Sequence, residues 1–245
     1  MSKIRSQWLL RALLVLLAVS ATAPLRASGP IDGTLFTTYT ITTDHTSVSL
    51  TVCGSVQQAV GCFGSGSMGP FGKVGALLEG NPSTNLTTGT VTRLIYVLDI
   101  AAGSLNTGVT LYVYKKTDLI SSTFDTVTVT LSKTVSLSLT GGTTALASMA
   151  ANSKFLFIGT NKSSDALKVQ KSNYTITPIF GFSPPVNVTA ITSDKYGYVT
   201  VTFGSFSGPE NGFIVFDANG NSLEDGGGAS FMLNTDQAVL PSTFH

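Results

Sequence analysis

The most constraining feature of this sequence is a two-residue alternation of apolar side chains with threonine or serine. The clearest examples are residues 126–131, 135–139 and 198–203. Because successive side chains of a β-strand point to opposite faces of its sheet, this alternation places one apolar row against a core and one hydroxyl-bearing row toward solvent. β-Branched threonine also suits the pleated surface of a strand. Helical periodicity is nearly absent after residue 27, so we expect an all-β protein.

The hydroxyl rows explain how a charge-poor chain stays soluble. Only 11% of the 245 residues are Asp, Glu, Lys or Arg, whereas threonine alone occurs 34 times. An average soluble domain carries about 25% charged residues. The 14 basic and 13 acidic residues nearly cancel, which leaves no basic footprint for nucleic acid. We therefore expect no nucleic-acid partner.

The N-terminus has the three parts of a secretory signal peptide. Three basic residues within the first eleven positions are followed by an apolar stretch at 12–19 and by small residues up to Ala27. The apolar stretch is shorter than the ~20 residues of a membrane span. We predict that residues 1–27 are a signal peptide, with cleavage after Ala21 as an alternative. Residues 28–245 are then one all-β repeat domain without a membrane span, which is secreted, periplasmic or on the cell surface.

The two cysteines, Cys53 and Cys62, are separated by eight residues. In an exported chain this spacing favours a disulfide across a hairpin-like turn, with two buried thiols as the alternative. A zinc site is disfavoured because it needs about four ligands. The only histidines available to such a site are His45 and His245.

A unit of two short strands, a polar turn between them and a third strand repeats along the chain. Residues 147–170 and 189–216 are the clearest copies, residues 92–114 contain an earlier copy, and residues 46–79 are a poorer one. Units of this kind with a length of about 40–50 residues are typical of propeller blades.

Residues 181–223 resemble one blade of an NHL-type β-propeller. The segment has a Pro-led strand, an Asp-x-x-Gly turn at Asp194, an aromatic-Val strand, and an Ile-x-Phe-Asp-x-x-Gly motif that starts at Ile214. The other copies keep the apolar rhythm without the Asp-x-x-Gly turn. The resemblance implies a small or incomplete β-propeller of about four to five blades. A β-sandwich of antiparallel hairpins is the alternative fold.

The densest group of oxygen ligands follows the last repeat. Its members are Asp217, Asn219, Asn221, Glu224 and Asp225. Alternating oxygens of this kind can approach one Ca²⁺, but a calcium loop places a glycine directly after the third alternating ligand, and here the glycine comes earlier. Asn-Gly between two apolar runs is also a strong indication of a hairpin turn. We predict a hairpin turn, with a calcium site as the alternative, and expect no other cofactor.

No set of catalytic residues stands out in the sequence. The only internal histidine, His45, lies in a polar turn, and no Gly-x-Ser-x-Gly elbow has the strand–turn–helix context of a nucleophile. We name no catalytic residue and expect an exported, non-catalytic binding or surface-interaction module for an unidentified ligand, glycan or protein. Because propeller folds host many functions, two alternatives stay open: a calcium-dependent propeller hydrolase, and a structural envelope or outer-membrane component.

Overall fold

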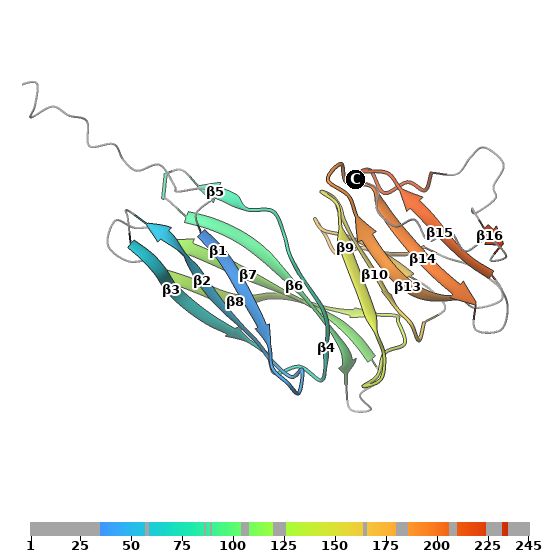
Figure 1. Cartoon of the computed structure of the whole chain (residues 1–245), viewed down its shortest axis with the longest axis horizontal. Helices are drawn as coiled ribbons and strands as arrows, with labels where there is room; N and C mark the ends of the chain where they lie inside the picture. The colour runs from blue at the N-terminus through green and yellow to red at the C-terminus, as the bar shows by residue number, and fades with distance from the viewer. Residues whose placement is uncertain are drawn as a thin grey trace, which may run out of the picture.

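The described part of the chain consists of β-strands, turns and loops in the computed structural model (Figure 1). The described residues are 35–56, 59–85, 87–88, 90–103, 108–119, 126–163, 166–179, 186–205, 210–223 and 232–234. No residue in these ranges is helical, which confirms the predicted all-β class. The signal peptide predicted for residues 1–27 lies outside them.

The strands form four antiparallel sheets in chain order. Sheet A contains β1 (Leu35–Ile41), β2 (Val48–Val56) and β3 (Ala59–Met68). Sheet B contains β4 (Val74–Glu79), β5 (Ser83–Asn85), β6 (Thr90–Ala102), β7 (Gly108–Leu119) and β8 (Thr126–Leu137). Sheet C contains β9 (Ala147–Ala151), β10 (Phe155–Thr160), β11 (Ala166–Gln170) and β12 (Ile176–Pro178). Sheet D contains β13 (Val186–Ser193), β14 (Val199–Ser205), β15 (Glu210–Phe216) and β16 (Met232–Asn234).

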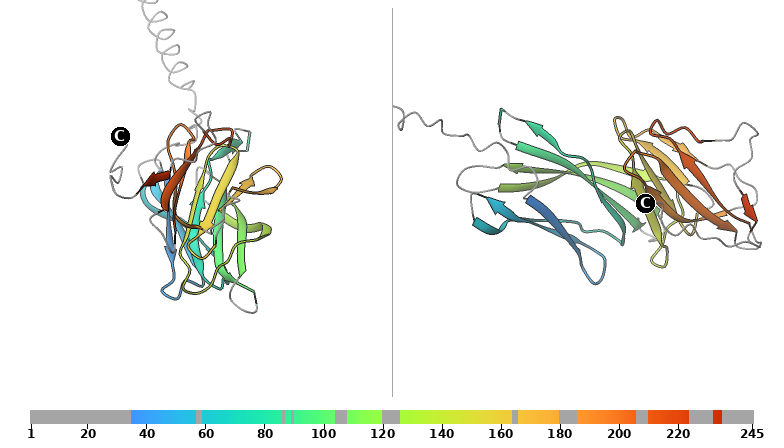
Figure 2. Two further views of the ribbon diagram at one scale, coloured as in Figure 1. Left: turned by 90° about the vertical axis from the view of Figure 1, so that its right-hand side faces the viewer. Right: turned by 45° about the horizontal axis from the view of Figure 1, so that its top comes forward.

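The sheets follow one another along the molecule, and the right-hand view of Figure 2 shows the same succession. Each sheet is packed on the next through its own core layer: A on B, B on C, and C on D. The described strands leave all four sheets open. The structure therefore confirms an all-β fold made of several antiparallel sheets.

The middle sheets are buried on both faces, and their sequence shows it. In β6, Ile95 and Val97 pack in the core with sheet A, whereas Tyr96 and Leu98 pack in the core with sheet C. Successive residues of a strand face opposite sides of the sheet, so a strand between two cores is apolar at every position. Because β6 lies between two cores, it carries a continuous apolar run. Strands with one face toward solvent show the alternation of apolar and hydroxyl-bearing residues instead.

The alternating stretch at 126–131 and most of the stretch at 135–139 belong to one strand, because β8 runs from residue 126 to residue 137. A β-bulge in its pairing with β7, at Val113/Tyr114, lies between the two stretches, and the apolar side chains before it pack with sheet A whereas those after it pack with sheet C.

One repeat assignment needs correction. The poorer copy at residues 46–79 is not one unit, because it spans β2 and β3 of sheet A and β4 of sheet B.

The copies at 147–170 and 189–216 correspond to sheets C and D. Sheet C approaches sheet D closely at Gly159, where a Cβ atom would lie 2.7 Å from Val188 Cγ1. Only glycine allows β10 and β13 to pack at this distance. Separately, no helix among the described residues has the length and apolar character of a membrane span.

Candidate functional site

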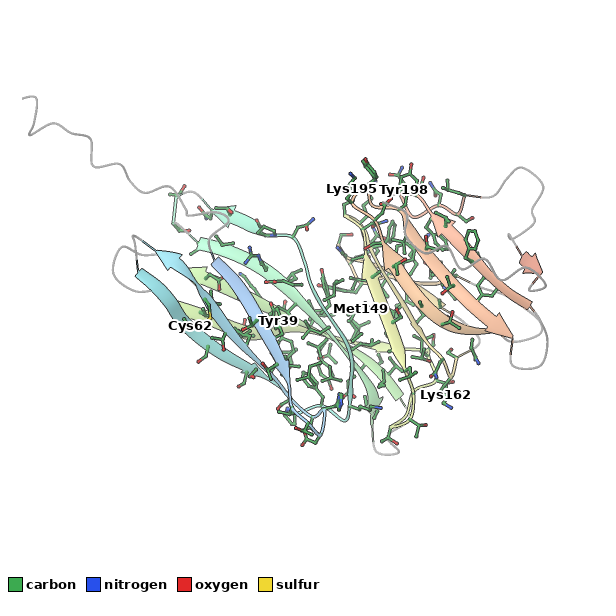
Figure 3. The ribbon with its side chains drawn as sticks, viewed as in Figure 1. Tyr39, Cys62, Met149, Lys162, Lys195 and Tyr198 are labelled. Carbon is green, nitrogen blue, oxygen red and sulfur yellow. A yellow bond between two sulfur atoms is a disulfide. The ribbon has the colours of Figure 1, made fainter. Side chains whose placement is uncertain are left out.

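Turns from sheets B, C and D surround a cavity of about 380 Å³. Sheet B contributes residues 78–81, sheet C contributes residues 151–153 and Lys171, and sheet D contributes residues 194–197 and Ala218. The volume lies at the lower end of the roughly 300–1,000 Å³ of small-molecule sites. In Figure 3, Lys195 and Tyr198 mark this end of the stack, and Met149 lies lower, between sheets B and C.

The position of the cavity follows from how the sheets stack. The first strands of sheets B, C and D lie side by side, with β9 contacting both β4 and β13. The turns that follow β4, β9 and β13 all line the cavity. The stacking therefore brings the turns that follow the first strands of three sheets to one end of the molecule.

Two of these turns are shaped by a side chain that accepts backbone hydrogen bonds. Asn152 Oδ1 accepts from the amides of Lys154 and Phe155, at 2.9 and 2.8 Å. Asp194 Oδ1 accepts from the amides of Tyr196 and Tyr198, each at 2.9 Å. Asn and Asp form such turns readily because their short side chains reach the backbone two residues on. The Asp-x-x-Gly segment ends at a glycine with a φ of +87°, a value that other residues rarely adopt.

Lys171 is a half-buried cation at the cavity. Its Nζ donates to the carbonyl oxygen of Asn152 at 2.6 Å and lies 5.8 Å from the ring centroid of Tyr96. Burial lowers the pKa of Lys171, because removing an ammonium from water disfavours its charged form. Among the described residues, no carboxylate lies within 4.0 Å of this ammonium.

An exposed aromatic side chain and a second lysine stand at the rim. Tyr196 is 69% exposed, and Lys195 Nζ lies 4.9 Å from the centroid of its ring. Lys195 forms no ion pair within the described part of the chain. The rim therefore combines a flat apolar ring with a positive charge.

The acidic side chains of the cavity are already engaged. The Asp194 carboxylate holds its own turn, as described above. Glu79 Oε1 lies 3.8 Å from Arg93 Nε and 3.6 Å from Lys116 Nζ. Arg93 and Lys116 therefore balance the negative charge of Glu79, and the charge at the cavity that has no ion-pair partner is mainly positive.

Glu79 connects the cavity to a charged cluster between sheets A and B. The cluster consists of Tyr39, Glu79, Arg93, Lys116 and Asp118, and Figure 3 shows Tyr39 in this layer. Lys116 is fully buried and donates to Asp118 Oδ2 at 2.9 Å. Burial, and then the negative charge of Glu79, raise the pKa of Tyr39 above its usual range. Two cations and two carboxylates make the cluster electrically balanced.

The predicted disulfide is confirmed and lies away from the cavity. Cys53 and Cys62 face each other in the pairing of β2 with β3 and are bonded. Figure 3 places Cys62 in sheet A, whereas the cavity lies between sheets B, C and D. The disulfide therefore joins neighbouring strands of one hairpin and supplies no group to the cavity.

Three of the candidate calcium ligands, Asp217, Asn219 and Asn221, lie in the turn after β15. Asp217 Oδ1 accepts from the amides of Asn219 and Asn221, each at 2.8 Å, and Asn219 Oδ1 accepts from Lys154 Nζ at 2.8 Å. Hydrogen bonds from Asn221 and Asn219 lower the pKa of Asp217. Glu224 and Asp225 lie outside the described residues. The part of the chain that is described contains no group of three or more His, Cys, Asp or Glu able to hold a metal. The calcium site stays the alternative to the predicted hairpin turn.

Other sequence-based assignments do not meet at the cavity. His45 is exposed in the turn between β1 and β2, where its carbonyl oxygen accepts from the amide of Val74 at 2.8 Å. Conversely, sequence reasoning named neither Lys171 nor Lys195 as a site residue. The alignment of the repeats places Asn152 and Asp194 in equivalent turns, and this was the available indication that their neighbours come together.

No model of a known protein family matches this chain, and no curated protein is detectably similar to it.

Proposed function

We propose that this chain is an exported, non-catalytic binding module whose ligand occupies the cavity between the turns of sheets B, C and D. The observation that carries the proposal is the convergence on one cavity of the turns that follow the first strands of three successive sheets. Binding residues are commonly placed on loops that a rigid scaffold positions. Export rests on the signal-peptide pattern at residues 1–27.

The architecture that best explains this convergence is an incomplete β-propeller with β4, β9 and β13 as its inner strands. Four consecutive antiparallel sheets and the side-by-side first strands of sheets B, C and D support this interpretation. Sheet A departs from it, because its backbone approaches sheet B most closely between β3 and β8 rather than between the first strands of the two sheets. Stacked β-sandwiches are the alternative architecture, since every neighbouring pair of sheets packs face to face.

A binding role agrees with the state of the polar groups in the cavity. The carboxylate of Asp194 holds a turn and that of Glu79 lies against two cations. Asn81 and Ser153 are exposed at the cavity and form no side-chain hydrogen bond with other described residues. The groups that are free to meet a ligand are therefore amide, hydroxyl, ammonium and aromatic groups.

The proposal is tested by ligand screening on the full-length protein as processed by its host. The ¹⁵N-labelled protein is titrated with mono- and disaccharides, amino acids and nucleotides, and amide shifts are followed by NMR. We expect a binder to move the amides of residues 151–153 and 194–197. A ligand that moves only amides of sheet A, or the lack of any binder, overturns the proposal.

A further inference from the structure

The charges at the cavity favour an anionic ligand. Four charged side chains line it: Glu79, Lys171, Asp194 and Lys195. Glu79 lies against Arg93 and Lys116, so its charge is balanced from the side of sheet A. Asp194 stands alone against two lysines that have no carboxylate within 4.0 Å among the described residues.

The Lys171 ammonium can donate more hydrogen bonds than the structure shows. An ammonium carries three N–H donors, and the structure gives Lys171 one hydrogen-bond acceptor, the carbonyl oxygen of Asn152. Burial disfavours its charge, as the lowered pKa indicates. A negatively charged group in the cavity would satisfy the remaining donors and offset the cost of desolvation.

The remaining free groups suit a sugar. The exposed ring of Tyr196 offers a flat apolar surface to the C–H face of a pyranose. The amide of Asn81 and the hydroxyl of Ser153 can both donate to and accept from sugar hydroxyls. The cavity volume of about 380 Å³ suits a compact ligand of one or two rings.

We propose that the cavity binds a mono- or disaccharide that carries a carboxylate or a sulfate, with the acidic group at Lys171 and Lys195 and a sugar ring on Tyr196. This inference rests on the proposed function, because it names the ligand class of the same cavity. The carboxylate and the sulfate share one chemistry, a compact anion on a sugar ring, and separate ligands distinguish them.

The test compares matched ligands by calorimetry and NMR on the full-length protein. The probes are digalacturonate, galactose 6-sulfate, the neutral disaccharide lactose, inorganic sulfate and adenosine 5′-monophosphate. We expect digalacturonate or galactose 6-sulfate to bind at least about tenfold more tightly than lactose, because hydrogen bonds to charged groups are the stronger ones. Added salt should weaken this binding, since it screens charges near the surface.

Three variants locate the acidic group and the ring. Lys171→Met and Lys195→Met each remove one charge and should lower affinity for the acidic sugar by about tenfold, a larger loss than for lactose. Tyr196→Ala should weaken both ligands. Lys162→Met is the matched control, because Lys162 is exposed at the opposite end of sheet C, as Figure 3 shows. Since Lys195 and Tyr196 are exposed in a turn, their replacement leaves the cores intact.

Each other outcome overturns a stated part of the inference. If lactose binds as tightly as the acidic sugars and moves the amides of residues 151–153, the proposal of an anionic ligand is wrong, whereas the proposed binding function is supported. If inorganic sulfate binds as tightly as the acidic sugars, or if adenosine 5′-monophosphate binds more tightly than they do, the proposal that the ligand is a saccharide is wrong. If no probe moves these amides and the wider screen finds no binder, both proposals fail.

Discussion

Lys116 Nζ lies 2.9 Å from Asp118 Oδ2 inside the interface of sheets A and B, and the side chains are 0% and 8% exposed. Both residues lie on β7 and point toward sheet A, because residues two apart in a strand share a face. Lys116 Nζ also donates to Thr37 Oγ1 of β1 at 2.6 Å. The pair therefore contributes to the contact between the two sheets as well as balancing charge.

Breaking this pair should destabilise the protein strongly. Lys116→Met leaves Asp118 with only the longer contact to Arg93 at 3.8 Å, and Asp118→Leu leaves Lys116 with only the longer contact to Glu79 at 3.6 Å. Removing one partner of a buried ion pair costs about 3–5 kcal/mol in comparable cases. The double variant should cost less than the sum of the two single variants, because it leaves neither charge. Urea unfolding measures all three, with Lys133→Met on the exposed face of β8 as control. Single variants within about 0.5 kcal/mol of the wild type would contradict this prediction.

Gly159→Ala should weaken the packing of sheet C on sheet D. The new Cβ would lie 2.7 Å from Val188 Cγ1, so the two strands must separate or side chains must shift. Overpacking of this kind costs about 1–3 kcal/mol. Adding Val188→Ala should restore part of the lost free energy of unfolding, because it removes two of the three Val188 carbons within 3 Å and leaves only Cβ, at 2.8 Å. Additive effects of the two substitutions would show that the contact is unimportant.

Removing the disulfide should lower stability without affecting the cavity. Cys53 and Cys62 are nine positions apart, so the bond closes a short loop and contributes about 2–3 kcal/mol in the chain-entropy estimate. The Cys53→Ala/Cys62→Ala variant should unfold at lower urea concentration while its amide signals at 151–153 and 194–197 stay in place. Shifts of those signals would mean that sheet A influences the cavity.

Alkaline pH should destabilise the protein through its buried tyrosines. Burial raises the pKa of Tyr96 to about 12 from the ordinary tyrosine value of about 10, and it also raises the pKa of Tyr39 and Tyr114. Above the unfolded value the unfolded chain loses phenolic protons that the folded protein keeps, so the free energy of unfolding falls as pH rises. For Tyr96 the affected window runs from about pH 10 to about pH 12. Tyr96→Phe should make this decline less steep in urea unfolding at successive pH values.

Calcium should not stabilise the turn at Asp217. Both amides that bond to Asp217 Oδ1, and the ammonium on Asn219 Oδ1, use oxygens that a calcium ion would need. We therefore expect the thermal midpoint to be the same in millimolar Ca²⁺ and in EDTA. A midpoint that rises with Ca²⁺ in the wild type but not in Asp217→Asn would establish the calcium site instead.

Much of the local structure could be predicted from the sequence. The alternation at 198–203 matches β14 closely, and the third strand of the repeat copy at 147–170 is β11. The disulfide was predictable because both cysteines belong to one hairpin. The bulge in β8 was not predictable, because it depends on the register of β8 against β7 rather than on the residues of β8 alone.

The sequence by itself determined which segments are strands, since strand periodicity is a property of neighbouring residues. Only the tertiary structure decided which groups meet at the cavity. Glu79, Lys171 and Lys195 are far apart along the chain, and the order of stacking brings them together. That order depends on pairs such as Leu156 and Phe157, neighbours that face sheet B and sheet D respectively. Apolar burial is non-directional, so an apolar side chain specifies that its face is covered but does not specify which sheet covers it.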